Sequence, residues 1–350
     1  MSVNYNSKYD GPGMKVHGRP DLILVVALDI SGSMGDPFQE DCKSGKSKLA
    51  IAKESLLALM GELRDTDLFG LVVFNHKAKI ITPVTKWSSL NHKELTEDIM
   101  RLRVTGGTDL VAGKCSANIF LQRSRQPMNC SEASRRARIC HAACFFLLVN
   151  LQSTHRFADL GARGEEFVAI TQANASKSLW MSIVGIGVDL ASDIIEKLSL
   201  VLGCNYSNGF KFMLKEEFPY SVTPIGFNVE LTIGSNDGGG RSFAFDRGFG
   251  SPEFNTLVSG SPGPAKSSTV FPCIKDENGE TRGGSFLFRL TRTFGNHLTM
   301  KTKYEDAEGI KHSDSQALAF PADMPDSGHF SDTGIRKAIL LVQYTDMCKL

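Results

Sequence analysis

Three oxygen-bearing side chains follow a short apolar run near the start of the chain. Asp29, Ser31 and Ser33 come directly after the run at residues 22–28, at positions i, i+2 and i+4 of a segment that contains glycine. One carboxylate and two hydroxyls in this spacing can converge as hard oxygen ligands, which suit Mg²⁺, Mn²⁺ or Ca²⁺ and not a soft metal. A second glycine-containing segment, residues 105–109, offers Thr108 as a further hydroxyl ligand. The residue types therefore predict a divalent-cation site.

The same side chains also have simpler structural interpretations. Asp29, Ser31 and Ser33 could form an Asx- or Ser-type turn. Thr108 could be a helix N-cap and nothing more. Asp109 would stand in a first helical turn, where an acid is favourable without a metal. Both interpretations stay open from the sequence alone.

Alternating strands and helices must position this candidate site. Short apolar runs, typical of buried strands, occupy residues 22–28, 68–74, 144–149 and 180–188. Apolar side chains three and four positions apart predict helices at residues 47–64, 92–103, 110–122, 165–178 and 193–202. The alternation predicts an α/β fold with a doubly wound, mostly parallel sheet covered on both faces. In such a sheet, ligands bind beyond the carboxyl ends of the strands.

The pattern changes from about residue 216 onward. Short runs at residues 227–233, 285–290, 297–304 and 316–320 are separated by turn segments rich in glycine, proline and serine. This pattern is typical of antiparallel sheets and predicts a β-sandwich-like domain. We therefore expect an N-terminal extension at 1–20, an α/β domain at 21–212 and a β-rich domain at 216–350.

Composition narrows the range of partners and compartments. The chain has 350 residues, of which 41% are apolar, and its 39 basic and 38 acidic side chains nearly cancel. Because the net charge is close to zero, the chain as a whole does not attract nucleic acid or an anionic membrane, so we expect no nucleic-acid partner. Apolar runs are far shorter than the roughly 20 residues of a membrane span, and the N-terminus lacks the apolar core of a signal peptide. The eight cysteines show no C-x-x-C spacing. A cytoplasmic protein without a membrane span is the expectation.

Motifs of common catalytic machinery do not occur in the sequence. Residues 44–47 end like a phosphate-binding loop, but Glu40 stands where that loop needs glycine. Residues 185–187 begin like a dinucleotide motif, but Leu190 replaces its last glycine. Neither H-E-x-x-H nor G-x-S-x-G is present. We therefore predict that the chain is not an enzyme.

Four motifs in order resemble the von Willebrand factor type A domain over roughly residues 21–210. Asp29-x-Ser31-x-Ser33 resembles the family's metal-ion-dependent adhesion site, and residues 106–108 resemble its threonine loop. Residues 67–74 are similar to the second strand, and residues 184–189 to the strand after the last site residue. The resemblance implies the strand order 3-2-1-4-5-6. It also implies a Mg²⁺ ion that accepts an Asp or Glu carboxylate of a protein partner.

One position departs from the family pattern. Asn150 stands where the resemblance implies an aspartate ligand at the end of a strand. An amide oxygen can still accept a water ligand but adds no negative charge, so Asp29 would be the main anionic group. The leading prediction is a cation-dependent adhesion-type interaction module. The alternatives are a structural or scaffold subunit with a degenerate metal site, and an enzyme of unknown type.

Four further segments leave questions open. Residues 218–231, 282–290 and 334–344 resemble a group of largely uncharacterised proteins in which a β-rich domain follows the type A domain. The apolar run at 334–344 looks like the start of a helix, so a truncated C-terminus is one expectation. The arginine-rich stretch 123–144 could be a surface insertion, a partner-binding loop or an error in the gene model.

Overall fold

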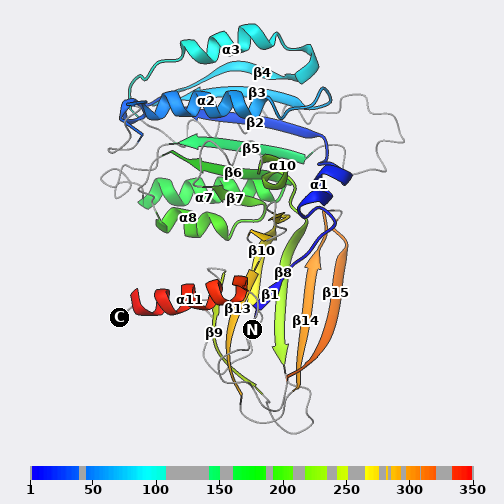
Figure 1. The fold of residues 1–350 in the computed structure, drawn as a ribbon. Coiled ribbons are helices and arrows are strands. Elements are labelled where there is room, and N and C mark those ends of the chain that lie inside the picture. Colours follow the sequence, from blue (N-terminus) through cyan, green and yellow to red (C-terminus); the bar gives the residue numbers. More distant parts are fainter. Residues whose placement is uncertain are drawn as a thin grey trace. The chain divides into compact units, whose positions relative to one another are not determined.

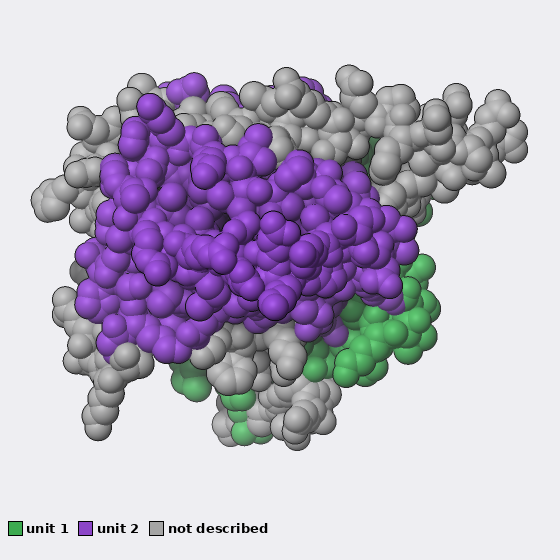
Figure 2. Space-filling model, turned by 90° about the horizontal axis from the view of Figure 1, so that it is seen from above, with its two compact units in different colours: residues 1–17, 224–350 green, residues 18–223 purple. Residues whose placement is uncertain are grey.

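The structure is a computed structural model. It describes residues 2–38, 45–107, 142–149, 161–186, 192–207, 217–234, 243–250, 265–275, 281–282, 285–292, 297–307, 309–320 and 333–348. The chain forms two compact units, which Figure 2 colours separately. One unit spans residues 18–223, and the other combines residues 1–17 with 224–350. The predicted helix at 110–122 and most of the arginine-rich stretch lie outside the described residues.

A six-stranded sheet forms the centre of the unit 18–223 (Figure 1). Its strands are β2 (Leu22–Asp29), β3 (Leu68–Phe74), β4 (Ala78–Lys86), β5 (Ala142–Val149), β6 (Leu179–Gly185) and β7 (Cys204–Ser207). They lie in the order β4-β3-β2-β5-β6-β7, and β4 alone of these strands runs antiparallel to its neighbour. This confirms the doubly wound fold and the strand order 3-2-1-4-5-6.

The apolar pattern of β2 explains why helices cover both faces of this sheet. All eight residues of β2 are buried, and successive side chains point to opposite faces. Leu24, Val26 and Leu28 join a core with helices α2 (Lys48–Met60) and α3 (His92–Arg101). Val25 and Ala27 join a second core with α7 (Gly161–Ala175) and α8 (Ser192–Ser199). A parallel strand buried on both faces requires this continuous apolar sequence.

A local signal fixes where α2 begins. The hydroxyl of Ser47 accepts a hydrogen bond from the backbone N–H of Ala50 at 3.2 Å, as an N-cap does. Short helical turns occur at η1 (Gly32–Gly35), η2 (Trp87–Ser89) and α10 (Phe218–Ser221). Met34 of η1 is fully buried in the same core as α2, which anchors the loop after β2.

The other unit consists mainly of antiparallel sheets, as predicted. One contains β1 (Ser2–Asn4), β13 (Ser285–Arg292) and β9 (Phe243–Phe249) in the order β1-β13-β9. The second has the order β10-β8-β14-β15, and the third pairs β11 with β12. Their bounds are β8 (Gly226–Gly234), β10 (Ala265–Val270), β11 (Ile274–Lys275), β12 (Thr281–Arg282), β14 (His297–Glu305) and β15 (Lys311–Ala319). The helices of this unit are α1 (Pro12–His17) and α11 (Thr333–Cys348).

Side chains from the two larger sheets share one core. Val3, Phe245 and Phe288 come from the three-stranded sheet, and Leu231 and Ala265 from the four-stranded sheet. The N-terminal residues take part in this packing, because β1 pairs antiparallel with β13, with Val3 opposite Phe286. In the described ranges, no helix is both long and apolar enough to cross a membrane.

Candidate metal centre

The candidate site begins at the carboxyl end of β2. Asp29 is the last residue of this strand and is fully buried. Its Oδ1 accepts a hydrogen bond from the backbone N–H of Ser31 at 2.8 Å. The turn that the sequence allowed is therefore present, and it fixes the carboxylate relative to the hydroxyl-bearing residues that follow.

The two serines of the motif lie side by side. Ser31 is buried and Ser33 is half-buried, and their Oγ atoms are 3.3 Å apart. Adjacent ligands of an octahedral Mg²⁺ ion, each about 2.1 Å from the metal, are separated by about 3 Å. The spacing of the hydroxyls and the chemistry of all three donors therefore fit a hard divalent cation.

The segment that leads to Thr108 runs beside this turn. The backbone N–H of Gly32 donates to the carbonyl of Gly106 at 3.0 Å, and that of Thr105 donates to the carbonyl of Ile30 at 2.8 Å. Thr108 itself lies outside the described residues. The two hydrogen bonds bring the segment before it to the edge of the sheet that carries Asp29.

The strand before Asn150 ends at the same edge. β5 pairs parallel with β2, and Leu148 lies opposite Leu28. Asn150 follows the last residue of β5 and lies outside the described residues. The structure thus brings Asp29, Ser31 and Ser33 together. It describes the segments that precede Thr108 and Asn150, but not those two residues themselves.

The β3–β4 turn supports the loop at residues 105–106. The side-chain amide of Asn75 donates to the backbone carbonyl of Thr105 at 3.1 Å and to its hydroxyl at 2.9 Å. Gly106 has a φ of +68°, and a Cβ there would be 2.7 Å from Nδ1 of His76. Glycine is required because an L side chain is strained at this φ and would also press on the imidazole.

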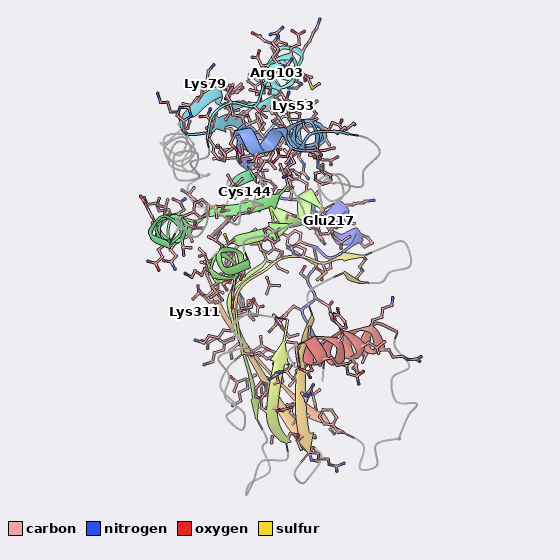
Figure 3. The ribbon with its side chains drawn as sticks, turned by 90° about the vertical axis from the view of Figure 1, so that its left-hand side faces the viewer. Lys53, Lys79, Arg103, Cys144, Glu217 and Lys311 are labelled. Carbon is pink, nitrogen blue, oxygen red and sulfur yellow. The ribbon has the colours of Figure 1, made fainter. Side chains whose placement is uncertain are left out.

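Two basic side chains missed by the sequence analysis fix the end of α3. Nζ of Lys53 donates to the carbonyls of Met100 and Leu102 at 3.0 and 2.6 Å. Arg103 donates to the same two carbonyls (Figure 3). Burial lowers the pKa of Lys53, and the charge of Arg103 lowers it further. Together they stabilise the negative end of the helix dipole where the chain turns toward the candidate site.

The position of Lys53 in α2 is a signal that the sequence analysis could have used. It lies four residues after Leu49 and three before Leu56, which is the spacing of the buried face of the helix. A lysine in such a row must find acceptors for its ammonium group. Its partners lie 47 and 49 residues away, so the pattern reveals the need for partners but not their identity.

Among the described residues, no group of three or more His, Cys, Asp or Glu side chains could hold a metal ion. The candidate set is of a different kind, because it combines one carboxylate with hydroxyls. In an open α/β sheet, a ligand loop after the first strand is the usual place for a binding site. The fold and this loop define a class of α/β binding domains.

Residues 24–143 match the von Willebrand factor type A domain. This part of the chain is therefore a von Willebrand factor type A domain, and further antiparallel sheets lie in the C-terminal part. This confirms the resemblance that the four sequence motifs carried. Domains of this family often bind divalent cations at a metal-ion-dependent adhesion site, and they mediate protein interactions.

Comparison with solved structures gives matches of low sequence identity. A von Willebrand factor type A protein from Catenulispora acidiphila is 14% identical, with a TM-score of 0.49, over 87% of this chain and 67% of that one. The ArnB paralog VWA2 from Sulfolobus acidocaldarius is 11% identical, with a TM-score of 0.37, over 91% and 67%. Proximal thread matrix protein 1 of the mussel byssus, with a zinc-occupied adhesion-site motif, is 16% identical, with a TM-score of 0.42, over 59% and 49%. Comparison with curated proteins gives no match.

Proposed function

We propose that the type A unit is a non-enzymatic, cation-dependent protein-interaction module. Asp29, Ser31, Ser33 and Thr108 would hold Mg²⁺, or Mn²⁺ or Ca²⁺ in its place, and Asn150 would hold a water ligand. The observation that carries the proposal is the convergence of a buried carboxylate and two hydroxyls, with Oγ atoms 3.3 Å apart, at the carboxyl end of β2.

The charge balance of the site favours an acidic partner. The bound cation supplies an electrophilic centre with one position open to an oxygen ligand. Asp29 contributes one negative charge, whereas the serine and threonine hydroxyls and the Asn150 amide contribute none. A divalent ion in this set keeps a net charge of about +1, which attracts an Asp or Glu carboxylate. The buried Asp29 holds the ion, and the neutral ligands leave its charge available to the partner.

Calorimetric titration of Mg²⁺ and Mn²⁺ tests the site directly. Asp29→Ala should weaken metal binding by at least 100-fold, because it leaves only neutral ligands. Asn150→Asp should tighten it by about tenfold, because it adds an anion. Asp36→Ala is the matched control, since Asp36 is an exposed carboxylate in the same loop, and it should bind like the wild type.

Circular dichroism of each variant establishes that the fold persists. Equal metal affinity in the wild type and Asp29→Ala would show that the ion binds elsewhere. Absence of binding in the wild type and in Asn150→Asp alike would exclude the adhesion site for this chain.

A second candidate function follows from Asn150 itself. The missing carboxylate favours a scaffold subunit whose metal site is degenerate and whose contacts do not need a cation. Affinity capture of partners in Mg²⁺ and in EDTA separates the two functions. Partners retained equally in both solutions would favour the scaffold, and partners released by EDTA would favour the adhesion module.

A further inference from the structure

Helix α11 has one face directed at the three-stranded sheet of its own unit. Asp346 forms ion pairs with Arg247 of β9, at 2.9 Å, and with Arg289 of β13. Between the helix and these strands lies a cavity of about 300 Å³. The helix contributes Ile339, Val342 and Gln343 to its lining, and the sheet contributes Phe249, Leu287, Phe288, Arg289 and Leu290. Figure 1 shows α11 beside β9 and β13. The pocket lining and the ion pairs place positions 339, 342, 343 and 346 on the face of the helix that is directed at these strands.

The opposite face of α11 is apolar and exposed. Leu340, Leu341, Tyr344 and Met347 have 64%, 62%, 65% and 73% of their surface accessible. They recur at three- and four-residue intervals, so they form one stripe along the helix. A helix that is apolar on two opposite faces is normally buried on both. This stripe is a surface that a partner would cover.

We propose that the stripe binds the same stripe of a second copy of the chain, with the two α11 helices antiparallel about a twofold axis. The first argument is charge. Arg336 and Lys337 lie in the amino-terminal half of α11, and its last turn carries the partial negative charge of the helix carbonyls. An antiparallel pair places the positive half of each helix beside the negative end of the other, whereas a parallel pair places like charges together.

The second argument is the fit of the stripe to itself. With the axis between positions 342 and 343, Leu341 of one copy lies beside Tyr344 of the other, and this contact occurs twice. Each Lys337 then lies near the partner's last turn. An interface in which one patch meets its own copy is what a twofold dimer requires.

The third argument is area. The exposed parts of the four side chains amount to roughly 500 Å² per copy, so their burial removes about 1,000 Å² in total, which is near the lower limit of specific interfaces. An interface of this size corresponds to a weak, reversible dimer. This dimer does not depend on the proposed metal site.

Sedimentation velocity and light scattering of the full chain, from about 1 to 200 μM, test the proposal. The 38.2 kDa chain should shift toward twice that mass across the range. Leu341→Glu and Tyr344→Glu should each raise Kd by at least 100-fold, because each places two buried charges in the dimer. Val16→Glu is the matched control, because Val16 is an exposed apolar residue on helix α1 of the same unit, and it should leave Kd unchanged.

Orientation is tested by Lys337→Glu. In the antiparallel dimer this change should raise Kd about fivefold to tenfold at low salt, and the effect should vanish at about 0.5 M salt. Lys301→Glu is its control, because Lys301 is an exposed lysine on β14 of the same unit. Circular dichroism verifies that every variant is folded.

A wild type that stays monomeric at 200 μM would overturn the proposal. So would a dimer that persists in both glutamate variants, since its interface would then lie elsewhere. Tighter association of Lys337→Glu would exclude the antiparallel arrangement.

Discussion

Asp67→Asn tests whether a buried ion pair stabilises the type A unit. Asp67 and Arg19 have side chains 0% and 1% exposed. Oδ1 of Asp67 accepts hydrogen bonds from Nη1 of Arg19 and from the backbone N–H of Leu22, both at 2.9 Å. Oδ2 accepts from Nη2 of Arg19 and, at 2.7 Å, from the backbone N–H of Arg64. The guanidinium also lies over the ring of Phe218, 5.6 Å from its centre.

The size of the effect follows from what the variant leaves behind. Asparagine keeps one acceptor oxygen but presents an NH₂ group to donors that the carboxylate had satisfied. Arg19 stays buried with its charge uncompensated. Breaking such a pair from one side costs about 3–5 kcal/mol in the free energy of unfolding, a large part of the 5–15 kcal/mol that domains possess.

The pH dependence gives an independent check. Burial by itself raises the pKa of Asp67, but the hydrogen bonds from Arg19, Arg64 and Leu22 outweigh it and hold this pKa below its ordinary value of 3.8. A lowered pKa in the folded state contributes stability above the ordinary pKa, which is lost as pH falls through the folded value. The difference in stability between wild type and Asp67→Asn should be constant from about pH 5 to 8 and shrink below about pH 4.

Urea unfolding followed by tryptophan fluorescence measures this difference. The chain has two tryptophans, Trp87 and Trp180, and both lie in the unit 18–223, so the signal reports that unit alone. Asp98→Asn is the control, because Asp98 pairs with Arg101 at the surface and should cost less than about 0.5 kcal/mol. A cost below about 1 kcal/mol for Asp67→Asn, or a difference in stability from the wild type that does not change with pH, would refute the reasoning.

Gly106→Ala should lower the free energy of unfolding, measured in urea, by about 1–2 kcal/mol, because an L side chain is strained at this positive φ. Adding His76→Ala should restore only the part of this loss that comes from the close contact of the new Cβ with the His76 ring. Gly203→Ala should cost about 3 kcal/mol and alter tryptophan emission, because φ is +70° there and a Cβ would be 2.0 Å from Cε3 of Trp180. Lys53→Met keeps the apolar stem but removes the donor, so we expect a loss of about 1 kcal/mol and faster hydrogen exchange at residues 102–106. Unchanged exchange there would show that the ammonium group does not hold the loop.

The sheet of the type A unit could be predicted because its strands are buried on both faces. β2 and β3 are continuous apolar runs, so local sequence suffices to locate them. β4 was not among the predicted strands. It is an edge strand whose side chains are exposed or half-buried except at Thr82, and it contains Pro83, so it has little apolar signal of its own. β1 could not be predicted either, because three residues become a strand only by pairing with β13.

For the candidate site, too, only the residues that are close in sequence could be predicted. Asp29, Ser31 and Ser33 are close in sequence, so their spacing alone predicted that they would converge. The contacts that support the neighbouring loop are not local. Lys53 meets Leu102, and the need for Gly106 depends in part on the approach of His76. Such contacts exist only after the sheet has brought distant segments together. The spacing of apolar residues along one sequence therefore does not predict them.

The pairing of β1 with β13 has a consequence for synthesis of the chain. The unit 18–223 is complete in sequence before the ribosome reaches β13, whereas β1 precedes that unit. At translation rates of about 5–20 residues per second, the roughly 280 residues between the two strands take about 15–60 s to make. The type A unit can fold during this interval, while Val3 and its neighbours have no sheet to join. β1 is therefore made long before its partner and joins its sheet late.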